Sequence, residues 1–180
     1  MGMNPFFREG PRGSRYTQPQ PRQPYGGQNR NQYQAQSSLG EAIKKIQSLK
    51  NMSELDPKDF AGIEGIAAKV AQEISKDMKT SQLRKFFDPL VKIEDELKKE
   101  SWTPEVEGRL YLVLPTLAYA VARHLAPKEF YSLIDECIKK VIVKEAPPDL
   151  KKANFQRFME FLRAIVAYNK YFGDEYFGGD

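Results

Sequence analysis

NFQRFMEFLRAIVAYNKYF, residues 154–172, is the stretch that decides the fold. Apolar side chains recur in it at helical spacing, on one stripe through Phe155 and Phe158 and on a second through Phe161 and Ile165. A helix with both stripes is apolar around more than half of its circumference. Full burial of each large apolar side chain contributes roughly 1.5–3 kcal/mol before conformational entropy is subtracted. We therefore expect a central helix with other helices packed on two sides of it.

Five further segments carry apolar residues at helical spacing. They span residues 38–49, 56–78, 80–97, 104–125 and 127–141. The expected N-caps are Ser38, Asp56 and either Thr80 or Ser81, and Gly173 is expected to end the last helix as its C-cap. The sequence shows no strand-like alternation, hairpin signal or internal repeat. It therefore predicts an all-α fold, a compact bundle of about six helices.

Prolines and glycines inside these segments predict local irregularities. Pro89 and Pro115 each remove a backbone hydrogen bond to the carbonyl four residues earlier. We expect a kink near Asp88 and an interruption of the 104–125 segment at Pro115. Gly62 and Gly65 each cost about 1 kcal/mol relative to Ala inside a helix, so the first turns of the 56–78 segment are expected to be loose.

The N-terminal residues differ from the rest in composition. Residues 1–37 are rich in Gln, Pro, Gly, Asn and Arg and lack a periodic apolar face, which predicts a disordered arm before a helical bundle domain at 38–180. Residues 1–38 hold five Arg and one Glu of the chain's 28 basic and 24 acidic side chains, so the body is neutral, with 23 of each. Arg and Tyr in the arm suit contacts with single-stranded RNA, although a solvated tail without a partner fits the same composition.

The number of cysteines and the hydropathy of the sequence indicate in which cellular compartment the protein is expected. The single cysteine, Cys137, cannot form an internal disulfide, and it lies on an apolar helical face. This favours a small buried hydrophobe in a reducing cytoplasm over a reactive thiol. No uncharged apolar run approaches the length of a membrane span, and Arg, Gln and Pro stand where a signal peptide would be apolar. We expect a cytoplasmic protein with no membrane partner.

The residues needed for catalysis are missing from the sequence. The chain has one His and one Cys and no metal-ligand spacing. His124 falls near a helix end, where a capping or solvent-exposed imidazole is the ordinary role. The glycines lack the context of phosphate-binding loops. We therefore expect no enzyme activity, no cofactor and no metal.

One basic cluster lies at a predicted helix start, in the sequence 79–85. Free backbone amides and hydroxyls, including that of Ser81, coincide there with Lys79, and with Arg84 and Lys85 one turn into the helix. This combination suits a phosphate. Ordinary capping with a solvated face explains the same residues, and the spacing alone does not decide between the two.

Other cations are more scattered. Arg123 ends an otherwise apolar helix, where it can contact phosphate or simply reach a carbonyl of the last turn. Lys152 and Arg157 belong to a looser group that also contains Lys139, Lys140 and Lys151.

Three motifs together resemble the Csm-type small subunit of type III-A CRISPR effector complexes. They are Thr80-Ser81-x-Leu83-Arg84, then Tyr119-Ala120-Val121-Ala122-Arg123, then Phe155-x-x-Phe158 leading to the sequence AIVAYxKY at 164–171. Their order and separation match the family over roughly residues 78–173. Family relatives often carry Glu at position 163 and His at position 169, where this chain has Arg163 and Asn169, and the N-terminal arm is not part of the family pattern.

The resemblance implies a non-catalytic helical subunit in antiviral defence. Several copies would stack head to tail along guide RNA and target RNA and hold the RNA backbone, while other Csm subunits cleave nucleic acid. Carried onto this sequence, the RNA-binding candidates are Ser81, Arg84, Lys85 and Arg123. Lys79, Lys152 and Arg157 are the second choices. A neutral body with a few local cations agrees with this implication, because phosphate contacts carry no sequence information.

The alternative is a helical adaptor that binds only proteins and makes no RNA contact. Tyr168, Tyr171 and Phe172 would then form an exposed apolar interface. Gel filtration and RNA crosslinking separate the two functions, because the adaptor predicts a partner complex without RNA.

Overall fold

The computed structural model describes residues 37–176, and within this range the chain is helical with no strand. The elements are α2 (Ser38–Ser48), the 3-10 helix η1 (Met52–Glu54), α3 (Pro57–Phe60), α4 (Ile66–Ile74), α5 (Thr80–Leu97), α6 (Pro104–Tyr111), α7 (Val113–Ala122), α8 (Lys128–Val141) and α9 (Pro148–Tyr176). The predicted all-α fold is confirmed. Each of the six expected segments is helical, and two of them are divided into two helices. Apart from Ser37, the expected arm lies outside the described residues.

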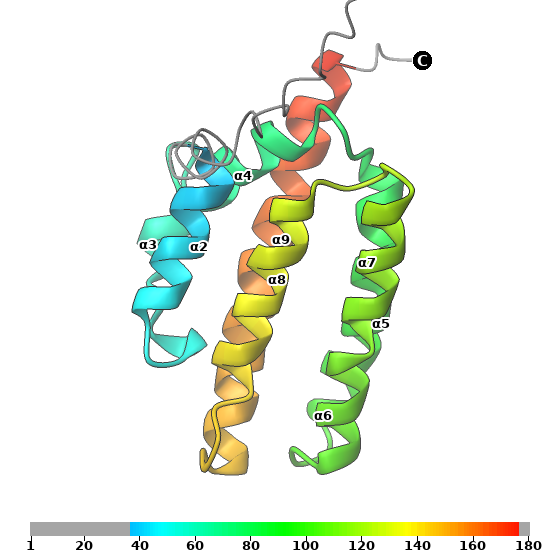
Figure 1. Cartoon of the computed structure of the whole chain (residues 1–180). Helices are drawn as coiled ribbons and strands as arrows, with labels where there is room; N and C mark the ends of the chain where they lie inside the picture. The colour runs from blue at the N-terminus through cyan, green and yellow to red at the C-terminus, as the bar shows by residue number, and fades with distance from the viewer. Residues whose placement is uncertain (1–36, 177–180) are drawn as a thin grey trace, which may run out of the picture.

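Helix α9 is the central element of the bundle. Helices α4, α5 and α8 and the 3-10 helix η1 all pack on it. Figure 1 shows α8 beside α9, with α2 and α3 on one side of this pair and α5, α6 and α7 on the other. The apolar side chains of the deciding stretch are buried, including Phe155, Phe158, Phe161 and Ile165. The prediction of a central helix covered on two sides is therefore confirmed.

Aromatic side chains join the surrounding helices to α9. The rings of Phe60 in α3 and Phe161 in α9 meet edge to face, with centroids 5.6 Å apart. The ring of Trp102, which precedes α6, has its centroid 6.0 Å from that of the Phe155 ring. Edge-to-face pairs contribute about 0.5–1.5 kcal/mol beyond the area that they bury. These contacts orient the outer helices as well as burying apolar surface.

Of the expected N-caps of α2 and α3, one is confirmed and the other lies one residue away from the prediction. Asp56 caps α3 as predicted, because its carboxylate accepts from the backbone amide of Lys58 at 2.9 Å. The cap of α2 is Ser37, and the prediction of Ser38 was wrong by one position. The Ser37 hydroxyl accepts from the amide of Gly40 at 2.9 Å and satisfies a donor of the first turn.

The expected cap of α5 was also wrong. The N-cap is Lys79, and Thr80 is the first helical residue. The side-chain carbonyl of Gln82 accepts from the Lys79 amide at 2.8 Å, which is one half of a capping box. Thr80 is not needed as a cap, and its hydroxyl binds another helix.

Proline acts differently at the two predicted sites. The 104–125 segment is interrupted, but the break between α6 and α7 falls at Leu112. Pro115 lies in the first turn of α7, where its missing amide would have no helical partner. Helix α5 is one helix through Pro89. The kink expected near Asp88 stays a prediction.

The 56–78 segment is split by a turn around its glycines. Helix α3 ends at Phe60 and α4 begins at Ile66, so the expected helix through residue 63 was wrong. The amide of Gly65 donates to the carbonyl of Gly62 at 2.8 Å. A Cβ at position 65 would lie 2.6 Å from the carbonyl carbon and oxygen of Phe60. Only a residue without a side chain fits this close backbone approach.

The two glycines give a matched pair of stability predictions. Gly65→Ala is expected to cost roughly 1–3 kcal/mol, because backbone has to move to admit the methyl group. Gly62→Ala is the control, since nothing lies within 4 Å of a Cβ there; its effect is expected within about 0.5 kcal/mol. Urea unfolding of both variants measures the difference. Equal stabilities would contradict the close approach at Gly65.

Gly173 does not end the last helix, which was predicted to stop there. Helix α9 runs through it to Tyr176, and it begins at Pro148, before the predicted stretch. Glycine permits a left-handed cap but does not impose one. The α carbon of Gly173 faces α5 instead, where an added Cβ would lie 3.7 Å from the Thr80 hydroxyl.

Ion pairs join α9 to itself and to α5. Arg157 pairs with Glu160 at 2.9 Å, as its spacing predicts. Arg163, six residues further along α9, contacts Glu94 of α5. The hydrogen bonds to that carboxylate raise the pKa of the Arg163 guanidinium. The charged side chains of α9 therefore form contacts both within the helix and with α5.

Candidate nucleic-acid interface

Helix α9 fixes the start of α5. The Thr80 hydroxyl donates to the side-chain carbonyl of Asn169 at 2.9 Å, and the Asn169 amide group donates to the carbonyl of Met78 at 3.2 Å. Asn169 is fully buried. Removing it would leave a hydroxyl and a carbonyl without partners, which costs about 1–3 kcal/mol for each buried group. The first turn of α5, with its basic residues, is thus held in place by hydrogen bonds to α9.

The predicted basic cluster forms one wall of an open depression of about 360 Å³. We call this the α5 depression; it is lined by Thr80, Ser81, Arg84, Lys85, Asp88 and Lys170. Ser81, Arg84 and Lys85 are exposed. The side chains of Arg84 and Lys85 have no ion pair or hydrogen bond with any other described side chain. Two unpaired cations therefore face solvent beside a hydroxyl.

Two charged residues of the α5 depression were not among the sequence candidates. Lys170 comes from α9 and adds a cation, while Asp88 comes from α5 and adds an opposing carboxylate. Lys170 lies far from the cluster in sequence. No signal in the sequence points to Lys170, because only the packing of α9 on α5 brings it beside the cluster.

Arg123 lies just past α7 as its C-cap residue. Its guanidinium donates to the Tyr119 hydroxyl at 3.2 Å and lies 5.6 Å from the centre of that ring. His124 follows in the left-handed region, with φ of 56°, and is exposed. This is the position after a helix end at which a chain often turns left-handed. The expectation of a capping or exposed imidazole is confirmed.

Arg123 lies at the same end of the bundle as the α5 depression. A second open depression, of about 410 Å³, brings Asp77 before α5 together with His124 and Lys128 after α7. Phe86 and Thr116 also line one hollow, so α5 and α7 run in opposite directions. The first turn of α5 and the last turn of α7 are therefore neighbours.

Lys152 and Arg157 lie elsewhere. Lys152 is 18 residues before Lys170 on α9, which corresponds to about 27 Å along the helix. Its ammonium donates to the carbonyl of Glu100 at 3.2 Å. Arg157 is partly buried, and its guanidinium contacts the carbonyl of Leu55 as well as Glu160. The structure does not bring these two residues together with the basic cluster.

The other lysines of the loose group also have partners. Lys139 pairs with Asp135 and Glu136, which raise the pKa of its ammonium. Lys140 donates to the backbone carbonyls of Gln47 and Leu49 at the end of α2, and Lys151 pairs with Glu107 at 3.0 Å. Lys139 is thus paired within α8, whereas Lys140 and Lys151 link separate elements of the fold.

The described residues also bear on catalysis and membrane contact. Cys137 is completely buried, and desolvation raises the pKa of its thiol far above the usual value. The burial of Cys137 that the sequence predicts is confirmed. No group of three His, Cys, Asp or Glu side chains within residues 37–173 could hold a metal ion. In the part of the chain that the structure describes, no helix has both the length and the apolarity of a membrane span.

Comparison with known proteins gives one match. No curated protein and no solved structure matches the chain. The family model for Csm2 Type III-A matches residues 57–175, which include the α5 depression, Arg123 and nearly all of α9. The chain therefore belongs to the Csm2 Type III-A family, the non-catalytic small subunit that assembles with other Csm subunits and crRNA in type III-A CRISPR complexes.

Proposed function

We propose that this subunit binds the sugar-phosphate backbone of guide RNA and target RNA without base specificity, and that it stacks with further copies of itself. The observation that carries the RNA proposal is the gathering of cations at one end of the bundle. Arg84 and Lys85 are exposed and unpaired among the described side chains, and Lys170 lines the same depression. Unpaired cations beside a helix N-terminus favour phosphate.

The proposed RNA path runs from the α5 depression to Arg123. Ser81, Arg84 and Lys85 would hold one part of the backbone, with Lys79 at the rim. Arg123 would hold the next part, because the two helix ends are neighbours. The Tyr119 side chain keeps the Arg123 guanidinium at the surface without neutralising its charge. Lys152 and Arg157 remain predictions of lower rank, because each has an intramolecular partner.

The charge of the site limits the affinity of a single copy. Asp88 lines the α5 depression beside the cations, and Asp77 lines the neighbouring hollow. These carboxylates oppose the binding of phosphate. One copy would therefore hold only a few phosphates and bind weakly, and stacked copies would bind tightly through their high effective concentration.

RNA binding by the purified full chain tests this proposal. Fluorescence anisotropy with oligo-U and oligo-A of equal length is expected to give equal affinities, because backbone contacts do not read bases. For three phosphate contacts, log Kobs should fall with log salt with a slope of about −2. Affinity that depends strongly on base identity, or that is absent at low salt, would contradict backbone binding.

The adaptor alternative is weakened by the aromatic residues on which it was based. The Tyr168 hydroxyl donates to the carbonyl of Ala61 at 2.8 Å, and Phe172 is partly buried against the core. Tyr171 alone among these three aromatics is largely exposed, at 62%. The predicted apolar interface at the end of α9 is therefore mostly packed within the molecule.

A further inference from the structure

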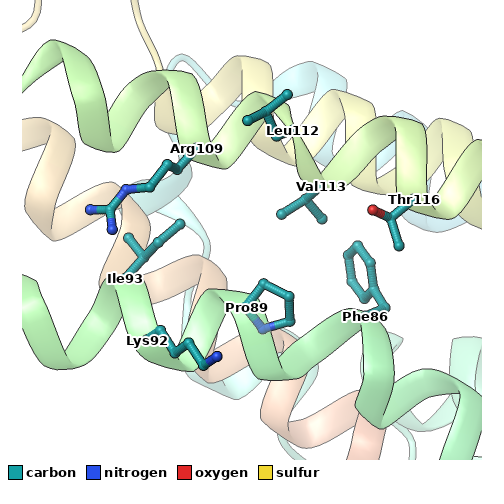
Figure 2. Close-up of a pocket in the computed structure, with 8 residues that line it drawn as sticks. All are labelled: Phe86, Pro89, Lys92, Ile93, Arg109, Leu112, Val113 and Thr116. Carbon is teal, nitrogen blue, oxygen red and sulfur yellow. The ribbon is translucent and has the colours of Figure 1, made fainter.

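A groove of about 320 Å³ lies between α5 and the pair of helices α6 and α7. Figure 2 shows Phe86, Pro89 and Ile93 projecting from α5 toward Val113 of α7. These four side chains give the groove an apolar floor. Its volume falls at the lower end of the range of ligand pockets, roughly 300–1,000 Å³, and has room for an aromatic ring. We call this the α5–α7 groove.

The rim of the α5–α7 groove carries two cations, Lys92 of α5 and Arg109 of α6. Arg109 contacts the carboxylate of Glu96. Lys92 is exposed and pairs with none of the described side chains. An occupant that suits this groove has an aromatic side chain next to carboxylates.

One wall of the groove is formed by α6 and α7, and these helices carry further exposed apolar side chains. Among the described residues five large apolar side chains are exposed, and three of them, Tyr111, Leu112 and Tyr119, lie on or between α6 and α7. Leu112 is the residue at the break between these helices and is 67% exposed. Exposed apolar side chains on the helices that line an apolar groove favour a role for this face in binding another molecule.

The chain itself contains a segment of the required chemistry at 173–180, GDEYFGGD. Asp174, Glu175 and Asp180 give it three acidic side chains and no basic one, and Tyr176 and Phe177 are adjacent aromatics. The N-terminal residues do not offer this match, because residues 1–38 hold five Arg and one Glu. Charge complementarity therefore favours the 173–180 segment as the occupant.

The aromatic residue Phe177 cannot reach the groove of its own chain. Gly173 lies beside Thr80, and Tyr176 is three residues further along α9, about 4.5 Å beyond the start of α5. Phe86, the nearest groove residue on α5, lies about 9 Å from Thr80 in the opposite direction. Whatever conformation Phe177 takes, its Cα stays about 3.8 Å from that of Tyr176. A gap of roughly 10 Å along the bundle therefore remains.

We propose that the acidic aromatic segment 174–180 of one copy binds in the α5–α7 groove of a second copy. Phe177 lies on the apolar floor, and Asp174 and Glu175 face Lys92 and Arg109. The groove and the end of α9 are different surfaces, so the contact is heterologous and can repeat head to tail. This inference rests on the self-stacking part of the proposed function and names the two surfaces that would carry it.

Peptide binding tests the site directly. The acceptor is the full chain with Phe177→Ala, so that its own segment does not compete, and the probe is a fluorescent peptide of residues 173–180. We expect saturable binding that Lys92→Glu in the acceptor weakens by roughly tenfold. Lys58→Glu on α3 is the matched control, since Lys58 is also exposed and lies outside the groove. A peptide carrying Glu175→Lys is expected to restore binding to the Lys92→Glu acceptor.

Two results of the peptide experiment would overturn the proposal. A peptide that does not bind, or that binds the Lys92→Glu and Lys58→Glu acceptors equally, shows that the segment does not occupy this groove. In the full chain, Phe177→Ala is expected to weaken self-association by roughly tenfold or more in sedimentation experiments. Undiminished self-association of that variant would reject the groove contact but leave stacking and RNA binding intact. Absence of RNA binding by the wild-type chain at low salt, under conditions in which it self-associates, would instead reject the proposed function.

Discussion

Replacement of both Arg84 and Arg123 by Glu is expected to weaken binding of single-stranded RNA by about a hundredfold at low salt. Each reversal removes a charge-assisted phosphate contact and adds a repulsion, which together cost about 1.4 kcal/mol or more at an exposed site. The salt slope should become shallower by about 1.4, since two phosphates are no longer neutralised. Fluorescence anisotropy with oligo-U over a range of salt concentrations measures both effects.

A matched variant separates local contacts from net charge. Lys58→Glu with Lys99→Glu changes the net charge of the chain by the same amount at two exposed residues outside the α5 depression. Its RNA affinity is expected to stay within about twofold of the wild type, because screening limits the reach of exposed charges. Circular dichroism should show unchanged helicity in both double variants. Equal loss of affinity in the two would indicate bulk attraction and argue against the site.

Asp88 allows the same site to be tested in the opposite direction. Asp88→Asn removes the carboxylate that lines the α5 depression while keeping the shape of the side chain. RNA affinity should then increase by roughly threefold, as expected when an exposed like charge is removed. A change of this sign would not follow from damage to the fold.

The largest expected effect on stability is that of Phe161→Ala. Phe161 is completely buried in α9 and meets Phe60 of α3 edge to face. Truncation of such a side chain typically costs about 3–5 kcal/mol, because transfer energy is lost and a cavity is left. For a chain of this size the midpoint of thermal unfolding should fall by roughly 6–20 °C. Calorimetry or thermal circular dichroism measures the shift.

Tyr171→Ala is the control for this experiment. Tyr171 lies on the same helix, is also aromatic and is 62% exposed. Its truncation is expected to change stability by no more than about 0.5 kcal/mol. If both variants unfold at the same temperature, α9 is not the centre of the core.

The sequence predicted the helices well because their apolar periodicity is strong. The stripes through Phe155, Phe158 and Phe161 are buried as expected, and Asp56 caps its helix. The errors concern helix ends, where tertiary contacts decide. Gly173 stays helical beside Thr80, and Lys79 becomes the cap because Gln82 folds back to its amide.

Less of the candidate site could be read from the sequence, since it depends on pairs that are distant in the chain. The cluster around Arg84 and Lys85 is local, and spacing was sufficient to find it. Lys170 enters the depression only because Asn169 anchors the start of α5. Lys152 and Arg157 each also contact a backbone carbonyl far away in sequence, which no pattern reveals.

The central claim is that cations at one end of a helical bundle hold the RNA backbone. The most direct test is a crosslinking map of RNA on the assembled type III-A particle, with photoreactive groups along the guide RNA and the target RNA. The expected crosslinks fall within the first turns of α5, near Ser81, Arg84 and Lys85, and around Arg123. Crosslinks confined to other faces of this subunit, or absent from it while neighbouring subunits are labelled, would contradict the claim.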